Sequence, residues 1–262
     1  MTAEGHAGRD WSATRYLAFE RERTRPVRDL LAEIPPEGIS RAVDLGYGPG
    51  NSTEVLIARF PGAEVEGVDS SPDMIAAARR RLPDTRFTLG DLGEGSGEAA
   101  DLLLANAVLQ WLPDHDRLLP DLIGRLRPGG WLAVQMPDNL AEPSHALMAE
   151  VAARGPWAER LASARRAPLM TAEGYLALFQ RHGATAEVWR TTYYHQLAGP
   201  EAIVDWVSST GLKPYLDRLD EEERPDFTAA YLEELRAAYP PLPDGRVALR
   251  FPRLFLLARR AG

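Results

Sequence analysis

Three glycines at alternate positions form the stretch of the sequence with the clearest chemical meaning. The run Asp44-Leu45-Gly46-Tyr47-Gly48-Pro49-Gly50 comes directly after a short apolar segment. Because glycine has no Cβ, the backbone at such a run can turn sharply and a ligand can approach it closely. A helix that begins directly after the run would point its free backbone N–H groups at the same place. The sequence therefore predicts a ligand-binding turn between a strand and a helix.

An acidic residue farther along the chain could bind the same ligand as this turn. Asp69 ends the next apolar segment about 20 residues after the glycine run, where a carboxylate can accept hydrogen bonds from both hydroxyls of a ribose. The alternative is a structural turn, in which Asp69 only caps the helix that begins at Pro72. The combination of the glycine run and Asp69 favours a ligand that contains a nucleoside.

The spacing of the glycines indicates which nucleoside ligand the turn suits. The dinucleotide fingerprint is G-x-G-x-x-G, whereas here the glycines are Gly46, Gly48 and Gly50. Asp44 precedes them, and a carboxylate there would repel a pyrophosphate and attract an ammonium group. S-adenosylmethionine (SAM) carries such an ammonium group. The sequence thus favours SAM over NAD, and an NAD-dependent oxidoreductase is the less favoured alternative.

Alternating strands and helices must position these residues. Nearly continuous apolar segments separated by helical ones are typical of a parallel sheet covered on both faces. We expect an α/β fold with a doubly wound, mostly parallel seven-stranded sheet. The predicted strands are 41–45, 64–69, 86–89, 101–105, 131–136, 187–196 and 247–258. The predicted helices are 11–34, 52–59, one from Pro72, 116–126, 144–151 and 172–181, with a helical block at 200–239 and a Pro-Gly-Gly turn at 128–130.

Long helical stretches interrupt the alternation after residue 136. In a bare nucleotide-binding fold these connections would be short, so we interpret the extra helices as a cap over the carboxyl edge of the sheet. The predicted division is a disordered tail at 1–10, an N-terminal helical lid at 11–36, a SAM-binding core at 37–139, and the rest of the sheet at 140–262 with cap insertions at about 140–170 and 199–246.

Composition excludes several classes of function. The sequence has no cysteine, and its five histidines include no pair at the spacing of metal ligands, so metal and thiolate chemistry are not expected. The net charge of -8 argues against a nucleic-acid partner. No apolar stretch of about 18 residues and no signal-peptide pattern is present. We therefore expect a soluble cytoplasmic protein with no membrane partner, and its oligomeric state is open.

The glycine run resembles the first motif of the class I SAM-dependent methyltransferases, which has the form acidic-x-Gly-x-Gly-x-Gly, and the resemblance covers about 41–136. It implies a Rossmann-like fold in which Gly46 and Gly48 line the methionine end of SAM. It also implies that Asp69 holds the ribose and that Asp91 meets the adenine amine, with a backbone contact from Leu92. The predicted cofactor residues are Asp44, Gly46, Tyr47, Gly48, Gly50, Asn51, Asp69, Ser70, Met74, Asp91, Leu92, Asn106, Ala107 and Gln110.

The segment after the fourth predicted strand lies at the carboxyl edge of the sheet, where open α/β sheets bind ligands. Asn106 and Gln110 could hydrogen-bond the cofactor or the substrate there, and Trp111 could form one wall of the pocket. The alternative is that Asn106 caps a helix and Trp111 packs in the core. Both interpretations stay open.

Several strings outside the cofactor motifs extend the resemblance over nearly the whole chain. They are Arg23-Thr24-Arg25-Pro26, Trp111-Leu112-Pro113-Asp114-His115, Val134-Gln135-Met136-Pro137-Asp138-Asn139, Trp189-Arg190-Thr191-Thr192-Tyr193-Tyr194-His195-Gln196 and Phe251-Pro252-Arg253-Leu254-Phe255. They are similar to carboxyl O-methyltransferases that esterify a small tricarboxylic acid such as trans-aconitate. Tyr47 departs from that pattern, which has a smaller residue such as Cys, and this could alter the shape of the pocket.

A tricarboxylate needs several cationic or hydroxyl donors, and arginine suits a carboxylate best because its planar fork can donate two hydrogen bonds. The predicted substrate residues are Trp11, Tyr16, Arg25, Gln110, Trp111, Arg190, Tyr194, His195, Lys213, Arg250 and Arg253. Taken alone, each of them is more often a solvated surface charge or a core aromatic residue, and only the group as a whole indicates a substrate site.

An ionised carboxylate can attack a methyl group without losing a proton, so no catalytic base is expected and His195 is not assigned that role. We predict an in-line SN2 transfer in which the pocket aligns one carboxylate oxygen with the sulfonium methyl group. A SAM-dependent methyltransferase for another small molecule and a SAM-binding protein without catalysis are the remaining alternatives.

Overall fold

The computed structural model describes residues 19–92 and 99–262. The predicted tail at 1–10 and the candidate residues Trp11 and Tyr16 lie outside the described residues. In the described part, no helix is both long enough and apolar enough to cross a membrane. The described residues also contain no group of three or more metal-ligating side chains that could hold an ion.

Seven strands form one sheet in the order β3-β2-β1-β4-β5-β7-β6. They are β1 (Arg41–Leu45), β2 (Glu64–Asp69), β3 (Arg86–Leu89), β4 (Ala100–Asn106), β5 (Leu126–Pro137), β6 (Ala184–Leu197) and β7 (Val247–Arg260). β1 pairs in parallel with both β2 and β4, β2 with β3, and β4 with β5. Strand order reverses between β1 and β4, and such a switch point is where doubly wound sheets bind ligands. The predicted fold class is confirmed.

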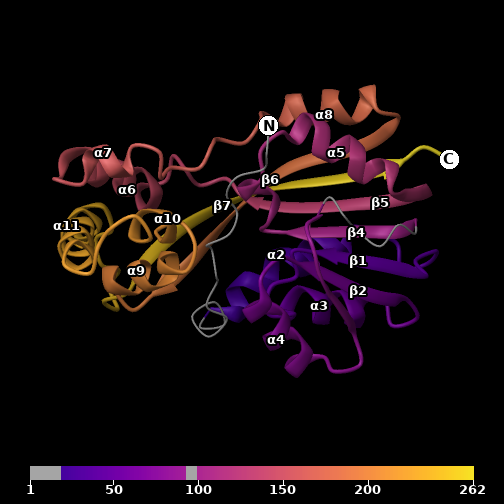
Figure 1. Cartoon of the computed structure of the whole chain (residues 1–262), viewed down its shortest axis with the longest axis horizontal. Coiled ribbons are helices and arrows are strands. Elements are labelled where there is room, and N and C mark those ends of the chain that lie inside the picture. The colour runs from indigo at the N-terminus through magenta and orange to yellow at the C-terminus, as the bar shows by residue number, and fades with distance from the viewer. Residues whose placement is uncertain (1–18, 93–98) are drawn as a thin grey trace. The chain divides into compact units, whose positions relative to one another are not determined.

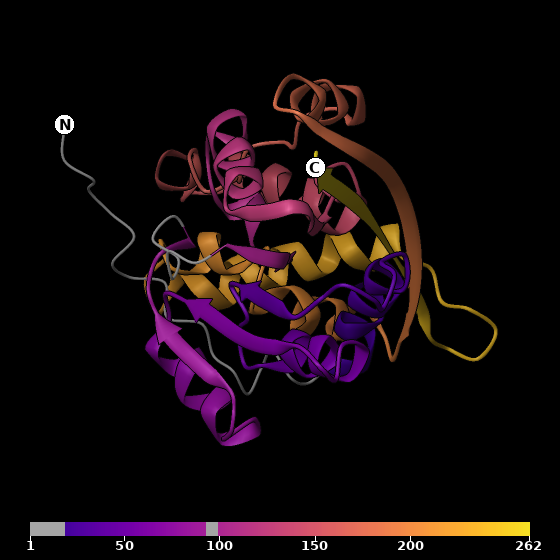
Figure 2. The same cartoon turned by 90° about the vertical axis from the view of Figure 1, so that its right-hand side faces the viewer.

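By its internal contacts the chain divides into two compact units. Unit 1 comprises the described residues up to Met136, Met170–Trp189 and Leu254–Gly262, and unit 2 comprises Pro137–Leu169 and Arg190–Arg253. The helices of unit 1 are α2 (Glu20–Ala32), α3 (Asn51–Arg59), α4 (Pro72–Arg81), the 3₁₀ helix η2 (Leu109–Trp111), α5 (His115–Gly124) and α8 (Ala172–Arg181). The helices α2, α3 and α4 lie on one side of the strands, and α5 and α8 lie together on the other (Figures 1 and 2).

Burial explains why the strands β1 and β4 form the centre of unit 1. Every residue of both strands is buried, as expected for strands covered by helices on two faces. Local signals fix the helix that follows β2: Pro72 is its first residue, and the Ser71 hydroxyl accepts a hydrogen bond from the Met74 N–H. Ser71, rather than Asp69, is therefore the N-cap of α4.

Unit 2 consists of helices and the adjoining ends of β6 and β7. Its helices are α6 (Pro143–Arg154), α7 (Ala158–Leu161), α9 (Pro200–Ser208), α10 (Lys213–Leu216) and α11 (Glu223–Ala238). α11 packs against α6 and α9. Two buried tyrosines tie the start of α6 to this bundle, because the Tyr231 hydroxyl donates to the Ser144 carbonyl at 2.6 Å and the Ser144 N–H donates to the Tyr239 hydroxyl at 3.0 Å.

The sequence prediction was wrong about residues 128–130. Pro128, Gly129 and Gly130 lie inside β5 and not in a turn before it. Gly129 has a φ of +77°, and the pairing of β5 with β4 shifts its register between Ala100 and Leu102. An irregularity of this kind lets a strand continue through residues that usually end one. The predicted helix 116–126 also ends earlier, at Gly124, because β5 already begins at Leu126.

Candidate functional site

The glycine run forms the turn between β1 and α3, and all three of its glycines have a positive φ. A Cβ on Gly46 would lie 2.4 Å from a methyl carbon of Val108, so this position allows the segment after β4 to pack on the loop. A Cβ on Gly48 would have no atom within 4 Å. Gly48 therefore leaves an open space next to the backbone at the carboxyl end of β1.

Asp44, the last residue but one of β1, is fully buried beneath the loop. Its Oδ2 accepts hydrogen bonds from Ser52 Oγ at 2.7 Å and Thr53 Oγ1 at 2.8 Å, which ties the strand to the first turn of α3. Burial raises the pKa of Asp44 to about 6, although these two hydrogen bonds lower it. Its Oδ1 accepts no hydrogen bond from the residues that the structure describes. The carboxylate thus has capacity for one more donor or cation.

Asp69 ends β2 and holds the loop from the other side. Its Oδ2 accepts from the Gly48 N–H at 2.9 Å, and its Oδ1 accepts from the Ser71 N–H at 2.9 Å. Burial raises the pKa of Asp69, and the backbone hydrogen bonds from Ser71 and Gly48 oppose that effect. A carboxylate has about four lone-pair positions. Asp69 can therefore hold the loop and still accept further hydrogen bonds.

The side chain of Tyr47 lies in an apolar cluster with Phe87, Ile75 and Ala78. Its ring centroid is 4.6 Å from that of Phe87. The absence of a side chain at Gly67 makes room for the ring, because a Cβ there would lie 2.5 Å from it. The Tyr47 hydroxyl is buried and has no hydrogen-bond partner among the described residues, and this burial raises its pKa.

The segment after β4 is held in a strained backbone conformation. Asn106 accepts a hydrogen bond from Gln135 on the neighbouring strand at 2.5 Å, and Ala107 has a φ of +54°, which is uncommon for a residue with a Cβ. The Gln110 side chain donates to the Ala107 carbonyl at 2.6 Å. The other polar atom of that side chain, Oε1, is buried and has no partner in the described part of the chain. Val108, which lies between Asn106 and Gln110 in the sequence, packs on Gly46.

His115 fastens this segment to α8, a role that sequence reasoning missed. Its Nε2 lies 2.8 Å from the Leu109 carbonyl, and its Nδ1 lies 2.7 Å from the Tyr175 hydroxyl. Because a carbonyl can only accept, Nε2 carries the proton and Nδ1 accepts from tyrosine. The sequence analysis singled out the string that ends in His115, but it could not identify the partner, Tyr175, because that residue lies 60 positions away in the sequence.

The other predicted cofactor residues differ in burial and in their hydrogen bonds. Asn51 is buried at the start of α3, and its Nδ2 has no hydrogen-bond partner among the described residues. Met74 is buried on α4, whereas Ser70 and Asp91 are exposed. The carbonyl of Leu92 already accepts a hydrogen bond from Arg125 at 2.6 Å. The roles of these residues toward a cofactor stay predictions.

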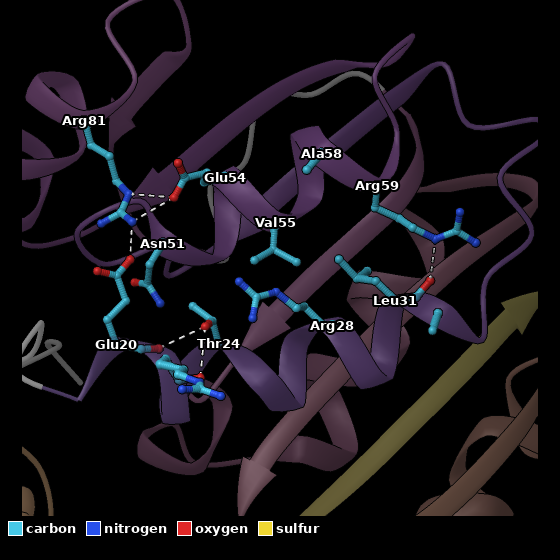
Figure 3. A pocket seen from close by; sticks show the side chains of 12 residues that line it. Glu20, Thr24, Arg28, Leu31, Asn51, Glu54, Val55, Ala58, Arg59 and Arg81 are labelled. Atoms are coloured by element: carbon cyan, nitrogen blue, oxygen red, sulfur yellow. Dashed lines mark hydrogen bonds and ion pairs between the residues drawn. The ribbon is translucent and has the colours of Figure 1, made fainter.

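A pocket of about 800 Å³ lies between α2 and α3, and of the predicted cofactor residues only Asn51 lines it (Figure 3). Arg81 is one of the lining residues and donates hydrogen bonds to two others, Glu20 and Glu54. The lining residues are Glu20, Arg21, Thr24, Arg28, Leu31, Ala32, Asn51, Glu54, Val55, Ala58, Arg59 and Arg81. The glycines of the loop do not line this pocket.

Most of the predicted cationic substrate residues have a carboxylate partner on the same chain. Arg190 pairs with Asp138 at 2.5 Å, Lys213 with Asp217 at 2.9 Å, and Arg250 with Glu142 at 2.7 Å. All three pairs lie in unit 2. In unit 1, Arg25 is exposed and lies 3.9 Å from Asp29. Tyr194 is 65% exposed and Trp111 is partly buried.

The other two predicted substrate residues of unit 2, His195 and Arg253, are buried beside Phe251. The His195 ring stacks on Trp206 with centroids 4.5 Å apart, and the Arg253 guanidinium lies 4.7 Å from the centre of the Phe251 ring. His195 and Phe251 have centroids 6.1 Å apart. Phe251 therefore lies beside both His195 and Arg253.

Residues 19–187 match the model of a methyltransferase domain. The chain is 56% identical over 254 residues to a trans-aconitate 2-methyltransferase of Methylobacterium nodulans, and the match covers 96% of this chain and 98% of the relative. It is 53% identical over 253 residues to the trans-aconitate 2-methyltransferase of Rhizobium meliloti, with 95% and 98% of the two chains covered.

Solved structures of low sequence identity share the fold. One is the YcgJ protein of Bacillus subtilis, with a TM-score of 0.59 at 11% identity over 90% of this chain and 98% of that one. Another is a methyltransferase structure from Bacillus halodurans, with a TM-score of 0.56 at 17% identity over 90% and 99% of the two chains. Together with the switch-point glycine loop and the identity over nearly the whole length, these matches show that the chain belongs to the methyltransferase-domain family, within the group of proteins named trans-aconitate 2-methyltransferase.

Proposed function

We propose that the chain is a SAM-dependent carboxyl O-methyltransferase that forms the monomethyl ester of trans-aconitate. The observation that carries this proposal is the identity of 56% to a relative of that name over 96% of the chain. Local geometry supports it independently, because the glycine loop, Asp44 and Asp69 meet at the switch point of the sheet.

The residues at the switch point fit SAM. Gly48 leaves open space beside the backbone, and the buried Asp44 Oδ1 and Gln110 Oε1 lack hydrogen-bond partners among the described residues. Two acceptors without donors suit a ligand with an ammonium group. Asp69 would accept from the ribose hydroxyls. When bound, SAM supplies a methyl group on a positively charged sulfur.

In the reaction, the residues of this chain would align one carboxylate oxygen of the substrate with the methyl group of SAM. An oxygen lone pair of the substrate carboxylate forms the new C–O bond, while the C–S bond breaks and its electron pair remains on sulfur. No proton moves, because the carboxylate is ionised near neutral pH. Arg253 and His195, which both lie beside Phe251, stay the predicted contacts to the other carboxylates. Correct alignment can lower the barrier by roughly 7 to 11 kcal/mol.

Calorimetric titration with S-adenosylhomocysteine and a transfer assay with labelled SAM test the proposal. The acceptors are trans-aconitate, cis-aconitate, isocitrate and a phenol. We expect micromolar cofactor binding and a base-labile product formed chiefly from trans-aconitate. Binding without transfer to any acid would contradict the carboxylate acceptor, and transfer to the phenol alone would indicate a different substrate class. If S-adenosylhomocysteine does not bind, the glycine loop is a structural turn.

A further inference from the structure

The pocket between α2 and α3 has no role in the proposed reaction, and its walls are two facing helix surfaces. Its residues on α2 recur every third or fourth position from Glu20 to Leu31, so they lie on one face of that helix. Its residues on α3 recur in the same way from Asn51 to Arg59. α2 packs against α3, and both helices belong to unit 1. The pocket is therefore a feature of one compact unit.

Two arginines tie these helices together at opposite ends of the pocket. Arg59, the last residue of α3, donates to the Ile34 carbonyl just after α2 at 2.6 Å. At the start of α2, Arg81 of α4 donates to Glu20, and it also donates to Glu54 of α3 at 2.7 Å. The space of about 800 Å³ between the helices is thus built into the unit, and its volume is in the range of small-molecule sites.

Arg28 offers a guanidinium to this space. Figure 3 shows its side chain extending from α2 between the two helices, toward Asn51. Arg81 engages both of the carboxylates that line the pocket, whereas Arg28 has no hydrogen bond or ion pair with any described residue. Because a guanidinium donates two parallel hydrogen bonds, Arg28 can receive a carboxylate.

Asn51 gives an independent indication of a ligand. Its side chain lines the pocket and is only 2% exposed, yet Nδ2 has no hydrogen-bond partner among the residues that the structure describes. Buried amide donors are normally paired, because an unpaired one loses its hydrogen bonds to water. Arg28 alone would be an ordinary solvated surface charge. Together with Asn51, it presents donors from two helices to one anion.

The rest of the lining indicates the class of anion. Glu20 and Glu54 carry two negative charges and share one cation, Arg81, so this end of the pocket disfavours an anion of high charge. Leu31 and Val55 add apolar surface to the two walls. This combination suits a single carboxylate attached to an apolar body, rather than a phosphate dianion or a tricarboxylate.

We propose that the pocket between α2 and α3 binds a small organic monocarboxylate with an apolar body. The carboxylate accepts hydrogen bonds from the Arg28 guanidinium and from Asn51 Nδ2, and the apolar body contacts Leu31 and Val55. This site is separate from the cofactor loop, because none of the three loop glycines lines it. It also does not depend on which acceptor the protein methylates.

Titration with phenylbutyrate tests the site, with the methyl NMR signals of Leu31 and Val55 as the readout. Two probes with the same apolar body serve as comparisons, the neutral phenylbutyramide and the more highly charged phenylbutyl phosphate. Each titration is made with and without saturating S-adenosylhomocysteine, which separates the pocket from the cofactor loop.

Three variants locate the contacts. Arg28→Glu reverses a charge inside the pocket, and Arg80→Glu makes the same change at an exposed position of α4 that does not line it. Ala58→Trp fills part of the space from the α3 side. Thermal unfolding checks that each variant is folded.

We expect phenylbutyrate to shift both methyl signals whether or not S-adenosylhomocysteine is present, and to bind more tightly than either comparison probe. Arg28→Glu should weaken its binding roughly 20-fold, because the loss of a solvent-exposed ion pair costs up to about fivefold and repulsion by the new carboxylate adds a similar factor. Arg80→Glu should change the affinity by less than about twofold, and Ala58→Trp should weaken binding without any change in charge.

Equal weakening by Arg28→Glu and Arg80→Glu would overturn the inference, because binding would then follow the net charge of the protein. Unshifted signals of Leu31 and Val55 would overturn it as well. If S-adenosylhomocysteine abolishes the shifts, the carboxylate occupies the cofactor site and the inference is wrong. Tighter binding of the phosphate or of the amide would contradict the assigned ligand class.

Discussion

The hydroxyl and the ring of Tyr47, in the cofactor loop, have opposite effects on the stability of the fold. Tyr47 buries a hydroxyl that has no hydrogen-bond partner among the described residues, while its ring fills an apolar cluster. Burying an unpaired hydroxyl costs about 1 to 3 kcal/mol by protein mutational data. The ring, in contrast, contributes favourable packing, and this accounts for a large residue at a position where the sequence resemblance favours a small one.

We therefore predict that Tyr47→Phe raises the free energy of unfolding by about 1 kcal/mol, because it removes the unpaired hydroxyl and keeps the ring. The matched control is Tyr231→Phe. That change removes a hydroxyl which donates to the Ser144 carbonyl at 2.6 Å, so it should lower the free energy of unfolding by about the same amount. Urea unfolding measures both. Destabilisation by Tyr47→Phe would mean that the hydroxyl has a partner.

Asp44 gives the protein a pH dependence of known sign. Its pKa is about 6 in the folded state against 3.8 for the ordinary side chain, so between these values the folded protein binds more protons than the unfolded chain. Stability therefore falls as the pH rises from about 4 to about 6, by up to about 3 kcal/mol, and then stays constant.

The difference in free energy of unfolding between wild type and Asp44→Asn isolates this contribution from that of other groups such as Asp69. Relative to the asparagine variant, the wild type should lose stability between pH 4 and pH 6 and show no further change above pH 7. Urea unfolding at four pH values is the measurement. A difference that does not vary with pH would mean that Asp44 titrates at its ordinary pKa.

At the scale of elements, the segment after β4 depends on two contacts with other elements. Val108 packs against Gly46, and His115 connects Leu109 with Tyr175 on α8. Double-mutant cycles with His115→Phe and Tyr175→Phe should give a coupling energy of about 1 kcal/mol, the typical value for one buried hydrogen bond. Additive effects in urea unfolding would argue against the contact.

The glycines of the loop allow a matched comparison between packing and ligand access. Gly46→Ala introduces a contact of 2.4 Å with Val108 at a φ of +68°, so we expect marked destabilisation that Val108→Ala partly relieves. Gly48→Ala meets no protein atom within 4 Å and should cost only about 1 kcal/mol of backbone strain. Calorimetry should nevertheless show weaker S-adenosylhomocysteine binding for Gly48→Ala. Undiminished affinity would place the ligand elsewhere.

At the scale of the whole molecule, the sequence predicted what depends on local patterns. The seven strands follow from apolar runs, and the loop follows from the spacing of Gly46, Gly48 and Gly50. Contacts between distant residues left no such pattern. The His115 contact with Tyr175 and the cluster of His145 with Phe251 join residues far apart in sequence. Residues 128–130 were misread because the neighbouring strand, rather than the local sequence, makes them part of β5.

The two compact units lead to a prediction about where each ligand acts. The switch-point loop belongs to unit 1, whereas His195 and Arg253 belong to unit 2. In hydrogen-exchange mass spectrometry, S-adenosylhomocysteine should slow exchange chiefly in peptides from 44–54 and 105–112. Addition of trans-aconitate to that complex should slow exchange in peptides from 193–197 and 250–253, because a bound ligand suppresses local opening of the segments that it contacts. A dicarboxylate such as mesaconate serves as the control and should protect these peptides less, because it lacks one of the carboxylates. If trans-aconitate protects neither of these two peptides, then His195 and Arg253 do not bind the acceptor, whereas the assignment of the cofactor loop would stand.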